Sequence, residues 1–178
     1  LSGLAGIASN LLLFAGKFFI GTISGSVSIT ADAMNNLTDA GSSVVTLIGF
    51  KLAEKPADED HPYGHARYEY LSGLVVAAMI IVIGFELANT SFEKILHPGS
   101  VVFSIPLVVV LVGSVLVKLW MSLFNTHLGK HIDSAALLAT AADSRNDVIS
   151  TTAVLVSLLI GHFAQVNLDG WMGLAVAL

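Results

Sequence analysis

Apolar residues fill most of the chain in segments of about 20 residues or more, and short polar stretches separate these segments. A helix needs about 20 mainly apolar residues to cross the roughly 30 Å hydrocarbon core of a bilayer, so such a segment can form one transmembrane helix. Only nine residues follow Asp169, about 14 Å of helix, so we expect the sixth helix to be truncated here. The pattern predicts an all-α integral membrane protein, a bundle of six transmembrane helices at about 1–27, 29–52, 68–90, 102–124, 134–161 and from 169 onward.

The composition agrees with this fold class and excludes several others. Of the 178 residues, 54% are apolar and 12% are charged, against roughly 25% charged in an ordinary soluble domain. The formal net charge of −5 argues against a nucleic-acid partner, which requires a basic surface. The chain contains no cysteine, which excludes disulfides and thiolate metal sites. We therefore expect one transmembrane domain over residues 1–178, surrounded by membrane lipids.

Basic residues in the loops predict the orientation of the helices. Lys51, Lys55, Arg67 and Lys130 lie in or beside the loops after the second and fourth segments, whereas Lys94 is the basic residue near the other loops. The positive-inside rule then places the second–third and fourth–fifth loops in the cytoplasm. We expect a multi-pass protein of the cell membrane whose two termini are cytoplasmic once the sixth helix is complete.

Polar side chains recur at helical spacing in two of the apolar segments. An ionised group in hydrocarbon costs at least about 2.5–3.5 kcal/mol, so these side chains should face a protein or water-lined interior. Each stripe contains oxygen donors at positions i and i+4, which lie on one face of a helix. If the stripes face one another, four side chains converge on one ion. The stripes are Asn35, Asp39, Ser42 and Thr46 in the second segment, and Thr140, Asp143, Asp147 and Ser150 in the fifth.

The surroundings of these carboxylates, as far as the sequence shows them, favour ion binding over a structural role. No cation is adjacent to Asp39 or Asp147 in sequence. Arg145 lies two residues from Asp143, about 200° around the helix, and so points away from the acidic face. Acidic residues at segment ends are expected instead to cap helices or to line a mouth; they are Asp32, Asp133 and Asp169.

The chemistry of the donors indicates which ion the stripes would bind. Three carboxylates and an amide offer only oxygen, and up to three negative charges can compensate a divalent cation. Oxygen favours harder ions, whereas imidazole and thiolate shift preference towards Zn²⁺ and copper, so Mn²⁺ is favoured and Fe²⁺ is next. Zn²⁺ stays open, because carboxylates also bind it and the Irving–Williams order favours it over Mn²⁺.

Together, the paired motifs and one loop resemble the cation diffusion facilitators over essentially the whole chain. The loop at 56–69 has the Asp-x-x-His-x-x-x-His spacing of that family. The resemblance implies a homodimeric, proton-coupled exporter of divalent transition metals that works by alternating access, with a cytoplasmic C-terminal domain of ferredoxin-like fold following this one. The metal is then cargo, and no prosthetic group is expected. The family's ligands map onto Asn35, Asp39, Asp143 and Asp147 for the transport site, and onto Asp58, His61 and His65 for a second site in the loop.

Two positions depart from the zinc-transporting members of that family, which usually have histidine at one or both positions matching Asn35 and Asp143. The pattern here resembles the manganese branch, and it requires a carboxylate rather than a histidine to take up the transported proton. Exporters of Zn²⁺, Fe²⁺ or Cd²⁺ from the same family stay as alternatives. The loop histidines could equally be solvated surface groups.

Two functions of other classes place acidic residues in membrane helices. An intramembrane aspartyl protease needs Gly-x-Gly-Asp and Tyr-Asp motifs, which the sequence lacks. A passive cation channel would need a filter, and no loop resembles a filter of backbone carbonyls. We therefore expect a transporter and not an enzyme.

Overall fold

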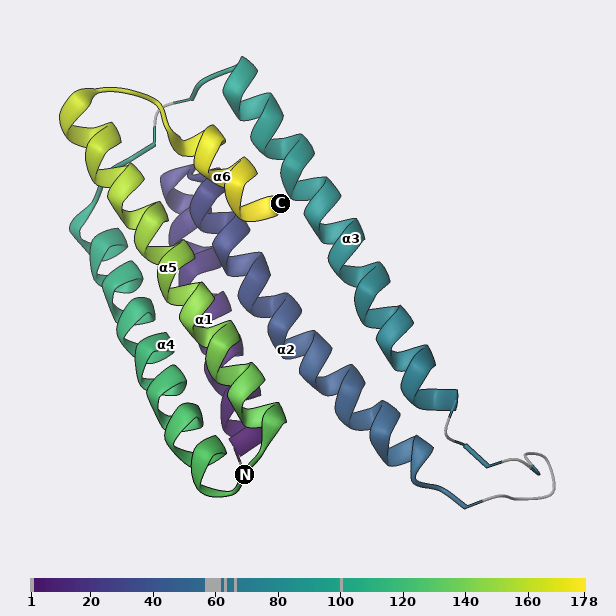
Figure 1. Cartoon of the computed structure of the whole chain (residues 1–178). Helices are drawn as coiled ribbons and strands as arrows, with labels where there is room; N and C mark the ends of the chain where they lie inside the picture. The colour runs from purple at the N-terminus through teal and green to yellow at the C-terminus, as the bar shows by residue number, and fades with distance from the viewer. Residues whose placement is uncertain (1, 57–61, 63, 66, 100) are drawn as a thin grey trace.

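The computed structural model describes residues 2–56, 62, 64, 65, 67–99 and 101–178 (Figure 1). Within these residues the chain forms six α-helices and no strand, as the apolar pattern predicts. The third and fourth helices continue past their predicted ends, to Leu96 and His131. The helices are α1 (Ser2–Ser24), α2 (Val27–Ala53), α3 (Arg67–Leu96), α4 (Ile105–His131), α5 (Ala135–Ala164) and α6 (Asp169–Ala177).

Four of the described helices, α1, α3, α4 and α5, are long and apolar enough to cross a membrane. Helix α2 has the necessary length of 27 residues but includes the polar stripe, and α6 has only nine residues. Large apolar side chains such as Phe85 and Phe163 are exposed on the outside of the helices, where lipid would cover them. The chain is a multi-pass membrane protein.

The helices form a bundle with one helix at its side. Helix α4 packs on α5 and α1, and α1 packs along α2, so these four helices surround a common interior (Figure 1). Helix α3 lies along the flank away from α4 and packs on α2 and α6. An apolar cluster fills the interior at the end nearest the turn between α1 and α2; its buried members are Ile29, Leu107, Leu111, Val154 and Leu158.

The N-terminus of α2 is capped by its own serine and by a residue from the far end of the chain. The Ser26 side chain accepts a hydrogen bond from the Ile29 amide. The carboxylate of Asp169 accepts hydrogen bonds from the amides of Val27 (2.8 Å) and Ser28 (3.2 Å), which have no partner within the helix. The prediction that Asp169 caps its own helix is therefore wrong: it begins α6 and fixes that helix to α2.

Asp133 also differs from its predicted role. The N-cap of α5 is Ser134, whose side chain accepts a hydrogen bond from the Leu137 amide. Asp133 precedes it in the left-handed region, with a φ of 53°, and is exposed. Aspartate and asparagine tolerate this conformation better than most residues, so Asp133 serves the tight turn between α4 and α5.

Candidate metal centre

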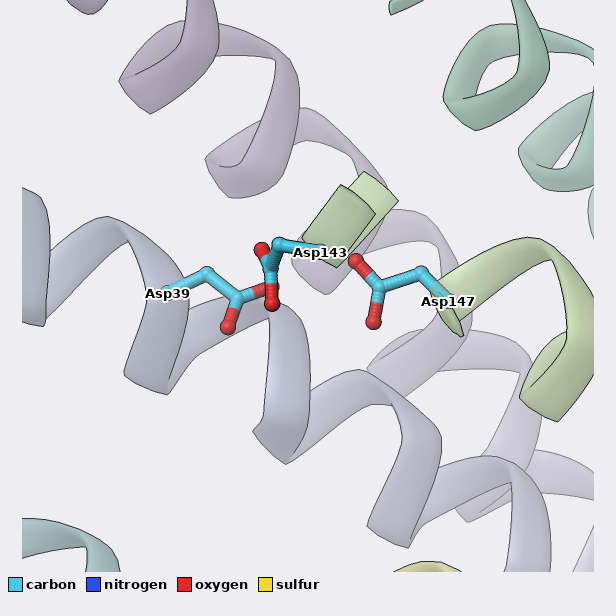
Figure 2. A group of neighbouring side chains, drawn as sticks. All are labelled: Asp39, Asp143 and Asp147. Carbon is cyan, nitrogen blue, oxygen red and sulfur yellow. The ribbon is translucent and has the colours of Figure 1, made fainter. Parts of the chain in front are cut away.

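Three carboxylates from two helices meet in the middle of the bundle. Asp39 projects from α2, and Asp143 and Asp147 project from successive turns of α5 (Figure 2). One oxygen of each lies within 4.8 Å of the other two. Hard divalent ions hold oxygen ligands at about 2.0–2.6 Å, so two ligands of one ion lie at most about 5 Å apart. The cluster therefore has the dimensions of a single-ion site, and the two predicted stripes do face each other.

Asn35 joins this cluster from the turn of α2 that precedes Asp39. Its side-chain nitrogen donates a hydrogen bond of 2.8 Å to Oδ1 of Asp147. All four residues predicted for the transport site are thus brought together. The amide nitrogen of Asn35 is therefore the atom that points to the cluster, where it contacts Asp147. An asparagine that ligates a metal would instead present its amide oxygen.

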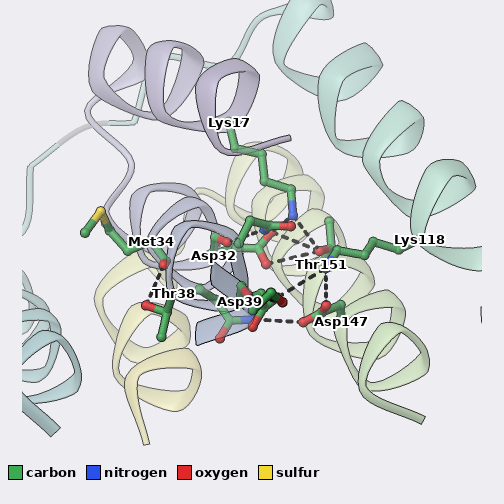
Figure 3. Close-up of polar contacts among 11 residues, drawn as sticks. Lys17, Asp32, Met34, Thr38, Asp39, Lys118, Asp147 and Thr151 are labelled. Atoms are coloured by element: carbon green, nitrogen blue, oxygen red, sulfur yellow. Dashed lines mark hydrogen bonds and ion pairs between the residues drawn. The ribbon is translucent and has the colours of Figure 1, made fainter. Parts of the chain in front are cut away.

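A lysine that sequence reasoning missed reaches into the same cluster. Lys118, at the middle of α4, donates to Oδ2 of Asp39 at 3.3 Å and also to Oδ2 of Asp147 (Figure 3). Although no cation adjoins Asp39 or Asp147 in sequence, the folded chain thus places a lysine beside both, and their surroundings are not free of a structural ion pair. Lys118 is 79 and 29 residues away in sequence, so only the packing of α4 shows the contact. A signal did exist, because a lone charge at the middle of an apolar helix must face the interior.

A second buried ion pair lies about two helical turns beyond the cluster along α2. Nζ of Lys17 on α1 is 2.8 Å from Oδ2 of Asp32 on α2. Thr151 on α5 accepts a hydrogen bond from Lys17 (3.0 Å) and donates one to Asp32 (2.9 Å), as Figure 3 shows. Asp32 is 1% exposed, so its predicted role as a cap or mouth residue is wrong. Helix α2 begins at Val27, which places Asp32 more than one turn inside it.

A cavity of about 520 Å³ leads to the cluster from one end of the bundle. Asp39 and Asp143 line it, together with residues from the first half of α1 and the second half of α4. This end contains the N-terminus, the C-terminal end of α2, the N-terminal end of α3 and the connection from α4 to α5 (Figure 1). On the opposite side of the cluster lie the Lys17–Asp32 pair and then the apolar cluster, both buried. The cavity thus lies on the side of the cluster nearer this end, and the opposite side of the cluster is covered.

The predicted second site is only partly visible. Asp58 and His61 lie outside the described residues. His65 is buried, its Nδ1 lies 3.1 Å from the carbonyl oxygen of Pro56, and its ring stacks on Tyr68. The loop site therefore stays a prediction.

The chain is similar to known transport proteins over nearly its whole length. The family model of the cation efflux transmembrane domain matches residues 3–178. An uncharacterized transporter of Methanocaldococcus jannaschii is 34% identical over 172 residues, 97% of this chain and 61% of that protein. Two manganese efflux system proteins of Bacillus subtilis are also similar. MneS is 33% identical over 93% of this chain and 57% of its own length, and MneP is 27% identical over 98% and 58%.

The chain thus spans about 60% of the length of these curated relatives. Over that span it aligns with them almost from end to end, and the family model covers it nearly completely. The chain belongs to the cation diffusion facilitator family, whose members are transporters and not enzymes.

Proposed function

We propose that the protein exports a divalent transition-metal cation across the cell membrane by alternating access, and that its preferred cation is Mn²⁺. The observation that supports this most is the convergence of three aspartates from two helices, two of which, Asp39 and Asp143, line a cavity. In this proposal Asp39, Asp143 and Asp147 ligate the ion, and Asn35 contributes its amide oxygen after rotating away from Asp147.

The choice of Mn²⁺ is supported by the donor set and by two relatives. The cluster offers carboxylate oxygens, to which Asn35 would add its amide oxygen after rotating; such donors favour a harder ion, and the described residues of the cluster include no imidazole. MneS and MneP are named as manganese efflux proteins. Export of Zn²⁺, Fe²⁺ or Cd²⁺ through the same site is the alternative.

The direction of export follows from the predicted orientation. If the loops rich in lysine and arginine are cytoplasmic, the cavity faces the cytoplasm, and hydrated metal reaches Asp39 and Asp143 from that side. Release on the other side requires α1, α2 and α5 to separate around Lys17, Asp32 and Thr151. We propose that rocking of the helices exchanges these two openings.

Proton coupling completes the proposed cycle. Three carboxylates so close together repel one another when all are ionised and no cation is present. Protons from outside would neutralise them and displace the metal, and the next metal ion would expel those protons. The family resemblance extends the proposal to a homodimer, a cytoplasmic C-terminal domain and the loop site of Asp58, His61 and His65.

Uptake by proteoliposomes tests this function. Mn²⁺, Zn²⁺, Fe²⁺ and Cd²⁺ are compared side by side at equal concentration, with a pH-sensitive dye in the lumen. We expect Mn²⁺ uptake to exceed that of the other ions and to drive protons in the opposite direction. Metal movement that leaves the pH untouched rejects antiport, and a proton-independent current indicates a channel. Cleavage of a reporter helix in detergent would indicate the protease.

Exchanging the ligands tests the argument from donor hardness. The variant Asn35→His with Asp143→His places imidazoles at two positions of the site, so we expect the Zn²⁺ to Mn²⁺ uptake ratio to rise by at least about tenfold. Arg145→His is the matched control, because it adds an imidazole to an exposed position of α5. Unchanged selectivity in the double variant contradicts the hardness argument.

A further inference from the structure

We propose that Lys118 neutralises the acidic cluster whenever no metal ion is bound, and that a divalent ion must displace its ammonium group in order to bind. The inference rests on the proposed function, because it concerns the same carboxylates. It assigns to α4 a residue that competes with the metal and so sets the affinity of the site.

The position of the ammonium group is the first argument. Nζ of Lys118 donates to one oxygen of Asp39 on α2 and to one of Asp147 on α5. It therefore bridges two of the three carboxylates whose oxygens are close enough to share one ion. A metal bound by both residues would take its ligands from the same two carboxylates that the ammonium group contacts. Two cations cannot share that space without strong repulsion, so one excludes the other.

The charge of the site is the second argument. Without a partner, the buried Asp147 and the half-buried Asp39 would each place a negative charge in the bundle, next to a third on the exposed Asp143. Lys118 is 0% exposed, so its ammonium group is shielded from water and can neutralise one of these charges. It can hold Asp39 and Asp147 in position until a metal ion enters, and it can return when the ion leaves.

A comparison with the other buried lysine separates this role from an ordinary structural ion pair. Lys17 is equally buried, but it pairs with a single carboxylate, Asp32, and both are held by Thr151. None of these three residues lines the cavity that leads to the acidic cluster. The partners of Lys118, by contrast, are members of the cluster, and Asp39 lines the cavity. The ion pairs of these two buried lysines therefore differ in whether their carboxylates belong to the cluster beside the cavity.

Titration calorimetry of the purified protein with Mn²⁺ tests the proposal. Lys118→Met removes the charge but keeps the length of the side chain, so we expect the Kd for Mn²⁺ to fall by at least about tenfold. The matched control is Lys130→Met, which removes a lysine from an exposed position of the same helix, away from the cluster, and should leave the Kd unchanged. An unchanged or higher Kd in Lys118→Met overturns the inference.

Failure of the inference and failure of the proposed function give different results. If the unaltered protein binds Mn²⁺, and Asp39→Asn abolishes that binding, the site stands whatever Lys118→Met does. If the unaltered protein does not bind Mn²⁺, the proposed function fails and the inference fails with it.

A second variant covers the case in which Lys118→Met does not fold. The chain has no cysteine, so Lys118→Cys introduces a single thiol. An aminoethyl disulfide adduct restores a side chain with a terminal ammonium group, whereas a methyl disulfide adduct is neutral. Both adducts are made on the same folded protein. We expect the aminoethyl adduct to bind Mn²⁺ at least about tenfold more weakly, and equal affinities would overturn the inference.

Discussion

Asp147→Asn is expected to reduce Mn²⁺ transport in proteoliposomes by at least about 100-fold. Asp147 is the buried member of the acidic cluster and accepts hydrogen bonds from Asn35 and Lys118. Residues that only support metal ligands typically contribute 10–100-fold to affinity or activity, so loss of a ligand should cost at least the upper figure. The substitution preserves the shape of the side chain, and the loss would therefore report on charge rather than on packing.

Asp133→Asn is the control for this measurement. Asp133 is exposed and has a positive φ, which asparagine also tolerates, so its replacement changes one acidic group without affecting the bundle. We expect transport by Asp133→Asn to match that of the unaltered protein. If Asp147→Asn is expressed and thermally stable as normal but transports at more than a tenth of that rate, Asp147 is not a ligand of the transported metal.

The sequence predicts the acidic cluster because its geometry is local to each helix. Asp143 and Asp147 share a face of α5 by spacing alone, and Asn35 and Asp39 share a face of α2. Whether the two faces meet depends on how α2 and α5 pack. A polar stripe on an apolar membrane helix is costly against lipid, however, and it therefore faces the interior of the bundle. This is why all four predicted residues come together.

The partners across helices could not be predicted in the same way. Lys17 and Lys118 interrupt apolar helices and must face the interior, but their spacing in sequence does not say which carboxylate each one meets. Helix boundaries were the other source of error. Asp32 and Asp169 lie close to segment ends in the sequence, and small differences in where a helix begins decide whether such a residue is a cap or a buried group.

The two lysines divide the interior of the bundle into layers. From the cavity inwards, an ion would first meet Asp39 and Asp143, then the buried Asp147 with its bound Lys118. Beyond them, the Lys17–Asp32 pair joins α1 to α2 and, through Thr151, to α5. Asp147 and Thr151 lie one turn apart on α5. A movement of this helix on metal binding would therefore also shift Thr151 relative to Lys17 and Asp32, which it contacts.

Lys17→Met is expected to destabilise the protein strongly. Removing one partner of a buried ion pair leaves an uncompensated charge, which typically costs about 3–5 kcal/mol. Both Lys17 and Asp32 are almost fully buried, and Thr151 alone would be left to solvate the carboxylate. Because each kcal/mol shifts the Tm by about 2–4 °C in a chain of this size, we expect Tm to fall by roughly 10 °C in a thermal-unfolding assay in detergent.

The double variant Lys17→Met with Asp32→Asn distinguishes this explanation from a simple packing defect. It removes both charges and keeps an amide that can accept a hydrogen bond from Thr151, so we expect it to recover most of the lost Tm. If the double variant is as unstable as Lys17→Met, the loss comes from side-chain packing and not from the buried charge of Asp32. A single variant that unfolds at the normal temperature would show that water reaches Asp32, and that the far side of the site is not closed.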